Sequence, residues 1–242
     1  MSAGQPTQSE RPSPALRADA VATRARIVSV AERLFAERGI DATSLAEINK
    51  AAGQRNRSAV QYHFGNKEGV VHAILDKHTP GIEQRRHLLL DDIEAAGPPR
   101  LRDLAEALVG PVADKLDDTD GGVEFLRINA QLIGHPAFPL LDLHTRRVNR
   151  GADRLQRLMA AAAPDLPQPL WISRWLLMIG LLFHGLADFA QLLEQPDPER
   201  AAPPRGLFVS NLVDAIVALM LAPVSDVTTR QLGKKEHRGV KS

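Results

Sequence analysis

The sequence contains no cysteine among its 242 residues, and aromatic residues make up only 4% of it. Without cysteine there is no disulfide bond, no thiolate metal site and no cysteine nucleophile. With so few aromatic residues, a hydrophobic core must be built from Leu, Ile, Val and Ala. Because hydrophobic residues still make up 44% of the chain, we expect a soluble globular protein made of helices rather than sheets.

The motifs of several enzyme classes are also missing. The chain has no phosphate-binding loop, no glycine-rich dinucleotide motif and no nucleophile elbow. Residues 1–18 are polar and lack the apolar segment of a secretory signal. In the most apolar stretch, residues 171–193, only 13 residues separate Arg174 from Asp188, short of the roughly 18–20 that span a bilayer. We therefore expect a cytoplasmic protein that is not an enzyme, with no cofactor and no membrane partner.

The net charge of +1 is unevenly distributed along the chain. Residues 1–78 contain 11 Lys or Arg and 8 Asp or Glu, a net charge of +3, whereas the remaining residues carry −2. This mild asymmetry agrees with a local DNA contact in the N-terminal part, although it does not establish one.

Residues 43–68 have the pattern of two short helices joined by a tight turn. Thr43 or Ser44 can accept hydrogen bonds from the first free N–H groups, and Glu47 follows Ser44 at the spacing of a capping box. Gly53 stands where the first helix would end in the left-handed conformation. The apolar residues of this helix share one face: Leu45, Ile48 and Ala52.

The second helix has a small apolar face formed by Ala59, Val60 and Phe64. Its other side, with the preceding turn, carries donors that can meet phosphates and base edges: Arg55, Asn56, Arg57, Ser58, Gln61, Tyr62 and His63. This layout is typical of a helix-turn-helix whose second helix enters the major groove of DNA. The alternative is a purely structural helix pair, since short amphipathic helix pairs occur in many enzymes.

Two runs of residues resemble the TetR/AcrR family of transcriptional regulators. They are residues 51–53 (Ala-Ala-Gly) and residues 60–68, from Val60 through Tyr62-His63-Phe64 to Asn66-Lys67-Glu68. Residues 34–44 also resemble the family's first helix and its exit, so that the similarity covers about residues 22–78.

The same segment departs from the family pattern in two ways. The stretch from Gly53 to Val60 is one residue longer than the commonest family spacing, and Gln61 stands where a tyrosine is frequent. The resemblance implies a homodimer, a phosphate contact by Lys67, and a fourth helix that links DNA binding to a ligand site in the C-terminal bundle.

The rest of the chain is expected to be helical, without strands. The first helix should span about residues 19–38, and the fourth should begin at Asn66, break or kink at Pro80-Gly81, and resume over residues 82–95. Glycine and proline separate the remaining helices, expected at residues 100–117, 122–133, 138–163, 168–195 and 205–221.

These elements predict four regions. They are a disordered arm (1–18), a helix-turn-helix DNA-binding domain (19–66), a helical effector-binding and dimerisation domain (67–222), and a disordered tail (223–242). The last two long helices carry more apolar surface, including Phe208 and Val213, than one small bundle needs, which indicates a dimer interface.

Polar residues in the C-terminal domain are candidates for anchoring an effector: Arg127, Asn129, His135, His144, Arg174, His184 and Asp188, with Trp175 on an apolar wall. Each of them is also compatible with a purely structural role. His184 and Asp188, four residues apart on one helix, could bind a metal or form an acid–base pair. Two ligands without a third do not make a metal site, and a hydrogen-bonded polar pair explains them better.

We therefore predict a dimeric transcriptional regulator, a repressor that binds a palindromic double-stranded DNA operator. The contacts are assigned to Thr43, Ser44, Lys67 and the donor face of the second helix. A mostly apolar small molecule would release it, because residues 100–221 offer many aliphatic side chains and few convergent charges. Two alternatives remain open, an all-helical enzyme using His184 and Asp188 and a helical scaffold for protein interactions.

Overall fold

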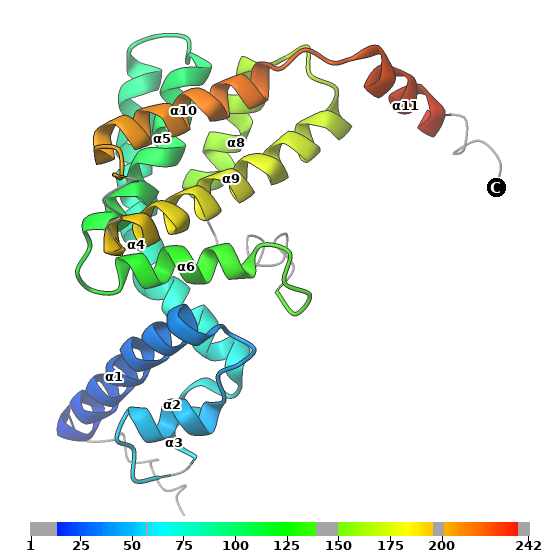
Figure 1. The fold of residues 1–242 in the computed structure, drawn as a ribbon. Coiled ribbons are helices and arrows are strands. Elements are labelled where there is room, and N and C mark those ends of the chain that lie inside the picture. Colours follow the sequence, from blue (N-terminus) through cyan, green and yellow to red (C-terminus); the bar gives the residue numbers. More distant parts are fainter. Residues whose placement is uncertain (1–13, 57, 139–149, 196–200, 237–242) are drawn as a thin grey trace, which may run out of the picture. The chain divides into compact units, whose positions relative to one another are not determined.

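The computed structural model of the chain describes residues 14–56, 58–138, 150–195 and 201–236. Every regular element in this part of the chain is helical, which confirms the predicted all-α fold (Figure 1). The chain divides into two compact units, Met1–Ile74 and Leu75–Ser242, which we call unit 1 and unit 2. The division falls after residue 74, within the fourth helix, later than the boundary at residue 66 that we expected.

Unit 1 consists of α1 (Pro14–Arg38), α2 (Leu45–Ala51), α3 (Ala59–Phe64) and the beginning of α4 (Lys67–Ala95). α1 begins before the expected Asp19, since proline suits the first turn of a helix, and the arm that we expected to be disordered is therefore helical from residue 14. Residues 1–13 lie outside the described part of the chain. The core of the unit draws on every one of its helices: Ile27, Leu34, Phe35, Ile48, Val60, Val70 and Ile74.

α4 runs without interruption through Pro80, so the break that we expected there does not occur. Proline at this position cannot donate a hydrogen bond to the carbonyl of Asp76. Both residues are exposed, so water can bond to that carbonyl and the helix continues.

Unit 2 contains the rest of α4 together with α5 (Leu101–Ala113), η1 (Asp114–Asp117), α6 (Gly122–Leu132), α8 (Arg150–Ala162), α9 (Gln168–Glu194), α10 (Arg205–Leu221) and α11 (Asp226–Glu236). The helices predicted at residues 100–117, 122–133, 168–195 and 205–221 are confirmed to within a few residues. Of the helix predicted at 138–163, residues 139–149 lie outside the described part, and the remainder is α8.

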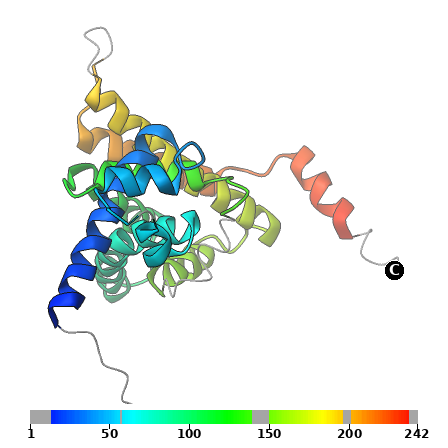
Figure 2. The same cartoon turned by 90° about the horizontal axis from the view of Figure 1, so that it is seen from below.

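The C-terminal tail differs from the sequence-based expectation. Residues 226–236 form α11 instead of a disordered segment, and Figure 2 shows it following an extended connection after α10. Ser225 explains where the helix begins, because its Oγ accepts a hydrogen bond from Thr228 N–H at 3.3 Å, as an N-cap does.

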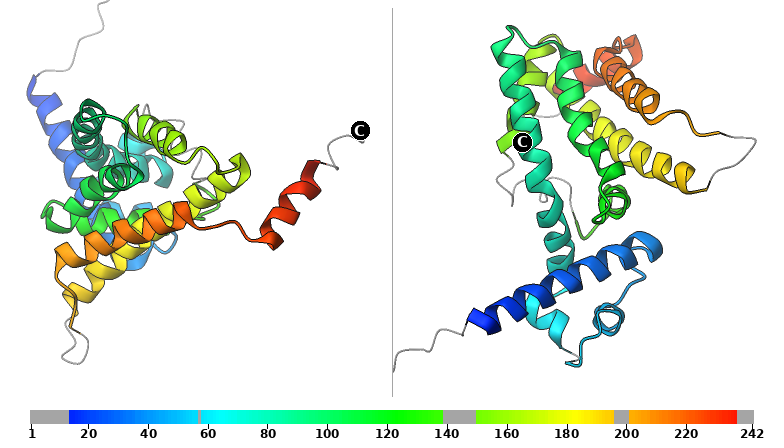
Figure 3. Two further views of the ribbon diagram at one scale, coloured as in Figure 1. Left: turned by 90° about the horizontal axis from the view of Figure 1, so that it is seen from above. Right: turned by 90° about the vertical axis from the view of Figure 1, so that its left-hand side faces the viewer.

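α9 and α10 lie side by side in unit 2, and α9 also packs on α6 while α10 packs on α5 (Figure 3). The rings of Phe189 and Phe208 stack between α9 and α10 at 4.0 Å. Val213 is buried within unit 2. Phe208, which we had placed with Val213 on a dimer face, is half-buried and packs on α9 of the same chain, and the dimer face stays a prediction. The apolar residues that remain exposed on this pair are Ile172, Leu176, Leu177, Leu181, Leu193, Leu207 and Leu221.

By length and composition alone, α9 is apolar enough to cross a membrane, and α10 with the start of α11 passes the same test as a bent pair. Core helices of soluble proteins also pass it. Met178, Leu182 and Leu186 of α9 are buried inside unit 2, so we interpret α9 as a core helix of this unit.

Candidate nucleic-acid interface and apolar cavity

The start of α2 is fixed by the capping box that the sequence predicts. Glu47 N–H donates to Ser44 Oγ at 3.2 Å, and Ser44 N–H donates to Glu47 Oε2 at 2.8 Å. The hydrogen bonds from Ser44, helped by the nearby Arg38 guanidinium, hold the pKa of the Glu47 carboxyl below its usual range. Ser44 remains exposed at this helix end, where a phosphate can approach it.

Thr43 does not lie on the surface and is not available to DNA. Its side chain is fully buried, and its hydroxyl donates to the carbonyl oxygen of Gly39 at 2.9 Å. The hydroxyl thereby bonds to a free carbonyl at the end of α1, where no further helical N–H follows. The prediction of Thr43 as a DNA contact is therefore wrong.

The turn between α2 and α3 is held by Asn49, a residue that we did not single out from the sequence. Its amide Nδ2–H donates to the carbonyl of Asn56 at 2.9 Å, and its Oδ1 accepts from Val60 N–H at 3.3 Å. Asn49 is only 5% exposed. One buried side chain thus bonds to both ends of the turn and sets where α3 begins.

The turn itself ends in a second local contact. Asn56 Oδ1 accepts from Ser58 N–H at 2.9 Å, an Asx turn that leads into α3 with Ser58 at its N-cap. Gly53 has the left-handed conformation that we expected, with φ of +65°. Arg55, Asn56 and Ser58 are exposed, whereas Arg57 lies outside the described residues.

α3 buries Ala59 and Val60 and turns its polar residues outward, as its sequence pattern predicts. Gln61 is exposed, and Tyr62, the single tyrosine of the chain, is 84% exposed. A tyrosine this exposed can offer both its ring and its hydroxyl to the surface of a partner. His63 is half-buried beside it, with ring centroids 5.2 Å apart.

Two cations fix α3 and α4 within unit 1. The Arg24 guanidinium lies 4.7 Å from the ring centroid of Phe64, which ties α3 to α1. Lys67 Nζ donates to the carbonyl oxygens of Ile40 at 2.8 Å and of Asp41 at 3.1 Å. Lys67 therefore has one of its three N–H groups left for a phosphate, and its first role is to hold the loop before α2. Lys50, exposed at the end of α2, is a donor that our sequence reasoning missed.

Unit 2 contains a cavity of about 110 Å³ with a mostly apolar wall. Leu108 and Val112 of α5, Phe125 of α6, and Trp175 and Leu182 of α9 contribute to it. Asn129 also lines it, so two of the predicted effector residues, Asn129 and Trp175, are brought together. Its polar wall comes from Glu83 and Arg86 of α4, which the sequence analysis did not identify.

The other predicted effector residues lie elsewhere. Arg127 forms an ion pair with Glu194 at 2.5 Å, and Arg174 NH1 donates to the carbonyl oxygen of Met220 at 2.6 Å, near the end of α10. His184 and Asp188 are both exposed on α9. None of these four lines the cavity. His135 does not line it either, and His144 lies outside the described residues.

Glu83 and Arg86 form an ion pair that is almost completely enclosed. Arg86 is 5% exposed, and burial lowers the pKa of its guanidinium while Glu83 opposes that shift. Arg86 Nε–H also donates to the carbonyl of Ala107 at 3.3 Å. That carbonyl would normally accept from the N–H of residue 111, but Pro111, inside α5, has none. Arg86 therefore occupies a carbonyl that a proline has left free.

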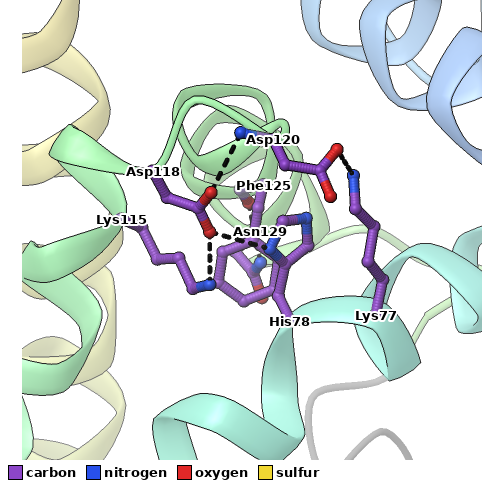
Figure 4. Close-up of polar contacts among 7 residues, drawn as sticks. All are labelled: Lys77, His78, Lys115, Asp118, Asp120, Phe125 and Asn129. Carbon is purple, nitrogen blue, oxygen red and sulfur yellow. Dashed lines mark hydrogen bonds and ion pairs between the residues drawn. The ribbon is translucent and has the colours of Figure 1, made fainter.

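Next to the cavity, a polar cluster joins α4 to the segment before α6 (Figure 4). Asp118 accepts hydrogen bonds from Lys115 Nζ at 2.7 Å and from Asp120 N–H at 2.9 Å, and these lower the pKa of its carboxyl. The buried His78 of α4 lies 3.8 Å from Asp118 and 4.7 Å, centroid to centroid, from the ring of Phe125. Phe125 thus touches both the cavity and the residue of α4 that faces Asp118.

Two family profiles match the chain. The profile described as "Bacterial regulatory proteins, tetR family" matches residues 27–74. The profile described as "Tetracyclin repressor-like, C-terminal domain" matches residues 106–218. They fall on the helix-turn-helix and on the helices around the cavity, respectively.

Curated relatives match the chain over a short segment. The HTH-type transcriptional regulator TtgR of Pseudomonas putida is 47% identical over 58 residues, which is 24% of this chain and 27% of TtgR. The HTH-type transcriptional regulator AcrR of Shigella flexneri is 49% identical over 49 residues, 20% of this chain and 22% of AcrR. The chain therefore matches about a quarter of the length of these relatives.

Solved structures match over most of the chain. TetR-family regulators from Rhodococcus sp. and Marinobacter aquaeolei each have a TM-score of 0.50 at 18% identity. The matches cover 82% and 83% of this chain, and 99% and 97% of the two solved chains. At this identity they support the fold alone. With the profile matches on both units, they lead to one conclusion: the chain belongs to the TetR/AcrR family of transcriptional regulators.

Proposed function

We propose that the protein is a homodimeric repressor that binds a palindromic DNA operator through α2, α3 and the turn between them. The observation that carries this proposal is the outward face of α3, where Gln61 and the 84% exposed Tyr62 project from a helix whose inner face is buried. Arg55 in the turn and Lys50 on α2 are further exposed donors, and Ser44 is exposed at the start of α2 with its own donors bonded to Glu47. Phosphate contacts position such a helix, and contacts to base edges give it specificity.

Dimerisation is supported by the apolar residues that α9 and α10 leave exposed. Leu177 is 60% exposed and Leu207 is 61% exposed. Exposed leucines and an isoleucine on two adjacent helices are the kind of surface that a second copy covers. A two-fold dimer carries two α3 helices, which is why we expect the operator to be a palindrome.

Release from DNA is assigned to a mostly apolar molecule bound in the cavity of unit 2. α4 supplies polar groups to the cavity wall, and its first turns belong to the core of unit 1. A ligand that favours one position of α4 will weaken DNA binding only if it binds the free protein more tightly than the DNA-bound protein. DNA must then weaken ligand binding by the same factor.

Selection from random duplex DNA tests the proposal. We expect an enriched palindromic motif and binding that weakens steeply with salt. Tyr62→Ala should reduce discrimination at one position by about 1–3 kcal/mol. Arg55→Ala should weaken binding to every sequence and lower the salt dependence by about one counterion.

Arg157→Ala, which removes an exposed arginine from α8, is the control and should bind DNA as the unmodified protein does. If the selection enriches no motif, the assignment to DNA is wrong. The enzyme alternative depended on His184 and Asp188, which are exposed on α9, and no observation favours it.

A further inference from the structure

The polar end of the cavity is the ion pair of Glu83 and Arg86, and the two side chains differ in how much of their hydrogen-bonding capacity is used. Both carboxylate oxygens of Glu83 are engaged, since Oε1 pairs with Arg86 NH1 and Oε2 accepts from the N–H of Ala152, at the start of α8, at 3.0 Å. The backbone presses closely here, because a side chain at Gly151 would come within 2.4 Å of that same Oε2. The carboxylate is therefore held in place from two sides and has little freedom to turn toward a ligand.

Within the part of the chain that the structure describes, Arg86, by contrast, gives only some of its donors to protein groups. Of the five N–H groups of a guanidinium, two are given there to Glu83 and to the Ala107 carbonyl. Arg86 lines the cavity, so a ligand oxygen there can accept from its remaining N–H groups. Asn129 adds a matching acceptor, since its amide nitrogen donates to the Phe125 carbonyl at 2.8 Å and leaves Oδ1 available.

The charge of this end is already balanced. Glu83 neutralises Arg86 inside a region that is almost closed to water, with the two side chains 15% and 6% exposed, respectively. A carboxylate on the ligand would place a second negative charge on one arginine, close to Glu83 and away from water, which is unfavourable in a low-dielectric site. A carbonyl, amide or hydroxyl oxygen can accept from Arg86 without adding charge.

The size of the cavity sets a second limit. An engineered cavity of about 150 Å³ takes up benzene, and the cavity in unit 2 measures about 110 Å³. A ligand of about one ring therefore fits only with a small displacement of the surrounding side chains, such as Phe125 or Trp175.

We propose that the cavity selects neutral, mostly apolar molecules of about one ring that carry a hydrogen-bond acceptor for Arg86, and that Glu83 is the residue that rejects carboxylates. This inference rests on the proposed effector role of the cavity. It assigns the chemical class of the effector and a specificity-determining residue that no feature of the sequence had indicated.

The test compares benzamide with benzoate, two probes of nearly equal shape that differ in charge, and toluene, which has no acceptor. Calorimetric titration of the full-length protein without DNA should give a dissociation constant for benzamide at least tenfold lower than those for benzoate and toluene. Glu83→Gln, which keeps the size of the side chain, should lower the dissociation constant for benzoate at least tenfold and leave that for toluene unchanged. Glu106→Gln, at an exposed glutamate of α5, should change none of the three.

Equal binding of benzoate and benzamide to the unmodified protein would overturn the proposal, as would a folded Glu83→Gln variant that still rejects benzoate. If that variant does not fold, the comparison of benzamide, benzoate and toluene on the unmodified protein decides alone. Absence of binding by all three probes would also overturn it. Because no DNA is present, these outcomes are separate from the DNA selection, which tests the proposed regulator by itself.

Discussion

The two units use their polar side chains in opposite ways. In unit 1 three polar side chains bond to backbone: the buried Asn49 holds the turn before α3, the buried Thr43 bonds to the end of α1, and the half-buried Lys67 bonds to the loop before α2. In unit 2 charged groups pair with one another across long helices, as Glu83 does with Arg86. In unit 1 these backbone bonds leave the outer face of α3 available to an external partner. In unit 2 the ion pair neutralises charge at the wall of the cavity.

Helix length explains the difference. α2 and α3 contain 7 and 6 residues, and isolated helices this short are not stable in water. Unit 1 must therefore fix their ends with hydrogen bonds. α9 and α10 contain 27 and 17 residues, and they are held in unit 2 mainly by buried apolar side chains such as Leu182, Leu186 and Ile216. The recognition surface of unit 1 thus depends on hydrogen bonds at helix ends, whereas the cavity of unit 2 depends on the packing of long helices.

The largest effect is expected where unit 2 buries charge. Glu83→Ala leaves the Arg86 guanidinium without its counter-charge in the interior, so it should lower the free energy of unfolding by about 3–5 kcal/mol. Glu106→Ala is the matched control, because Glu106 pairs with Arg102 at 3.2 Å on the surface, and it should cost less than about 1 kcal/mol. Urea denaturation of both variants measures the difference. Equal losses would contradict our description of the ion pair as buried.

The second effect concerns the exposed apolar face of unit 2. Leu177→Glu should raise the dissociation constant of the dimer at least a hundredfold, which is about 2.8 kcal/mol, because a charge is left without water in the interface. Leu88→Glu on α4 is a close control, since Leu88 and Leu177 are both 60% exposed. Sedimentation across a concentration series measures both. A dimer that survives Leu177→Glu would show that α9 does not form the interface.

The third prediction distinguishes a residue that holds the turn before α3 from a residue that is proposed to contact DNA. Asn49→Ala leaves the N–H of Val60 without this partner and removes one of the two donors to the Asn56 carbonyl, which keeps Ala59 N–H at 3.1 Å. Unfolding should therefore become easier by about 1–3 kcal/mol. DNA affinity should fall with it, because the turn no longer positions α3. Gln61→Ala should change DNA preference while stability stays within about 0.5 kcal/mol. Thermal melts and DNA titrations of the two variants form the test, and a stable Asn49→Ala variant would contradict the role of this side chain.

The smallest expected effect is a dependence of the free energy of unfolding on pH in the acid range. Hydrogen bonds from Lys115 and from Asp120 N–H lower the pKa of Asp118 in the folded protein. This contribution is therefore fully present above the unfolded pKa of about 3.9 and is lost as the pH falls through the folded value. Asp118→Asn should reduce the loss of stability between about pH 5 and pH 3, measured as urea midpoints. An identical pH profile in the variant would show that Asp118 does not contribute to the loss of stability in acid.

Much of the fold could be predicted because its signals are local. The Ser44–Glu47 capping box, Gly53 after α2 and the prolines between later helices act within a few residues, so the sequence alone reveals them. The outward side of α3 was predictable for the same reason, since only two of its residues need to face inward. The continuation of α4 through Pro80 was not predictable from the residue type, because it depends on whether the freed carbonyl meets water.

The cavity was harder to predict because its polar groups depend on tertiary contacts. Glu83 and Arg86 have the spacing of an ordinary exposed helix pair, and only Ala107 and Ala152, distant in sequence, reveal that they are enclosed. His184 and Asp188 misled us in the opposite direction, because α9 has apolar residues on several sides and its pattern does not show which side is covered.

Pro111 and Arg86 are coupled through the carbonyl of Ala107, so a change of one residue alters the effect of changing the other. Replacing Pro111 by alanine supplies the missing N–H, which would share the carbonyl of Ala107 with Arg86, since a carbonyl oxygen can accept two hydrogen bonds. In a chain without Arg86 the same N–H would be the donor that this carbonyl lacks in α5. We therefore expect the substitution to stabilise a chain without Arg86 more than one that has it, which is a case of epistasis. Relatives that lose the arginine at this position should accordingly lose the proline more often than relatives that keep it.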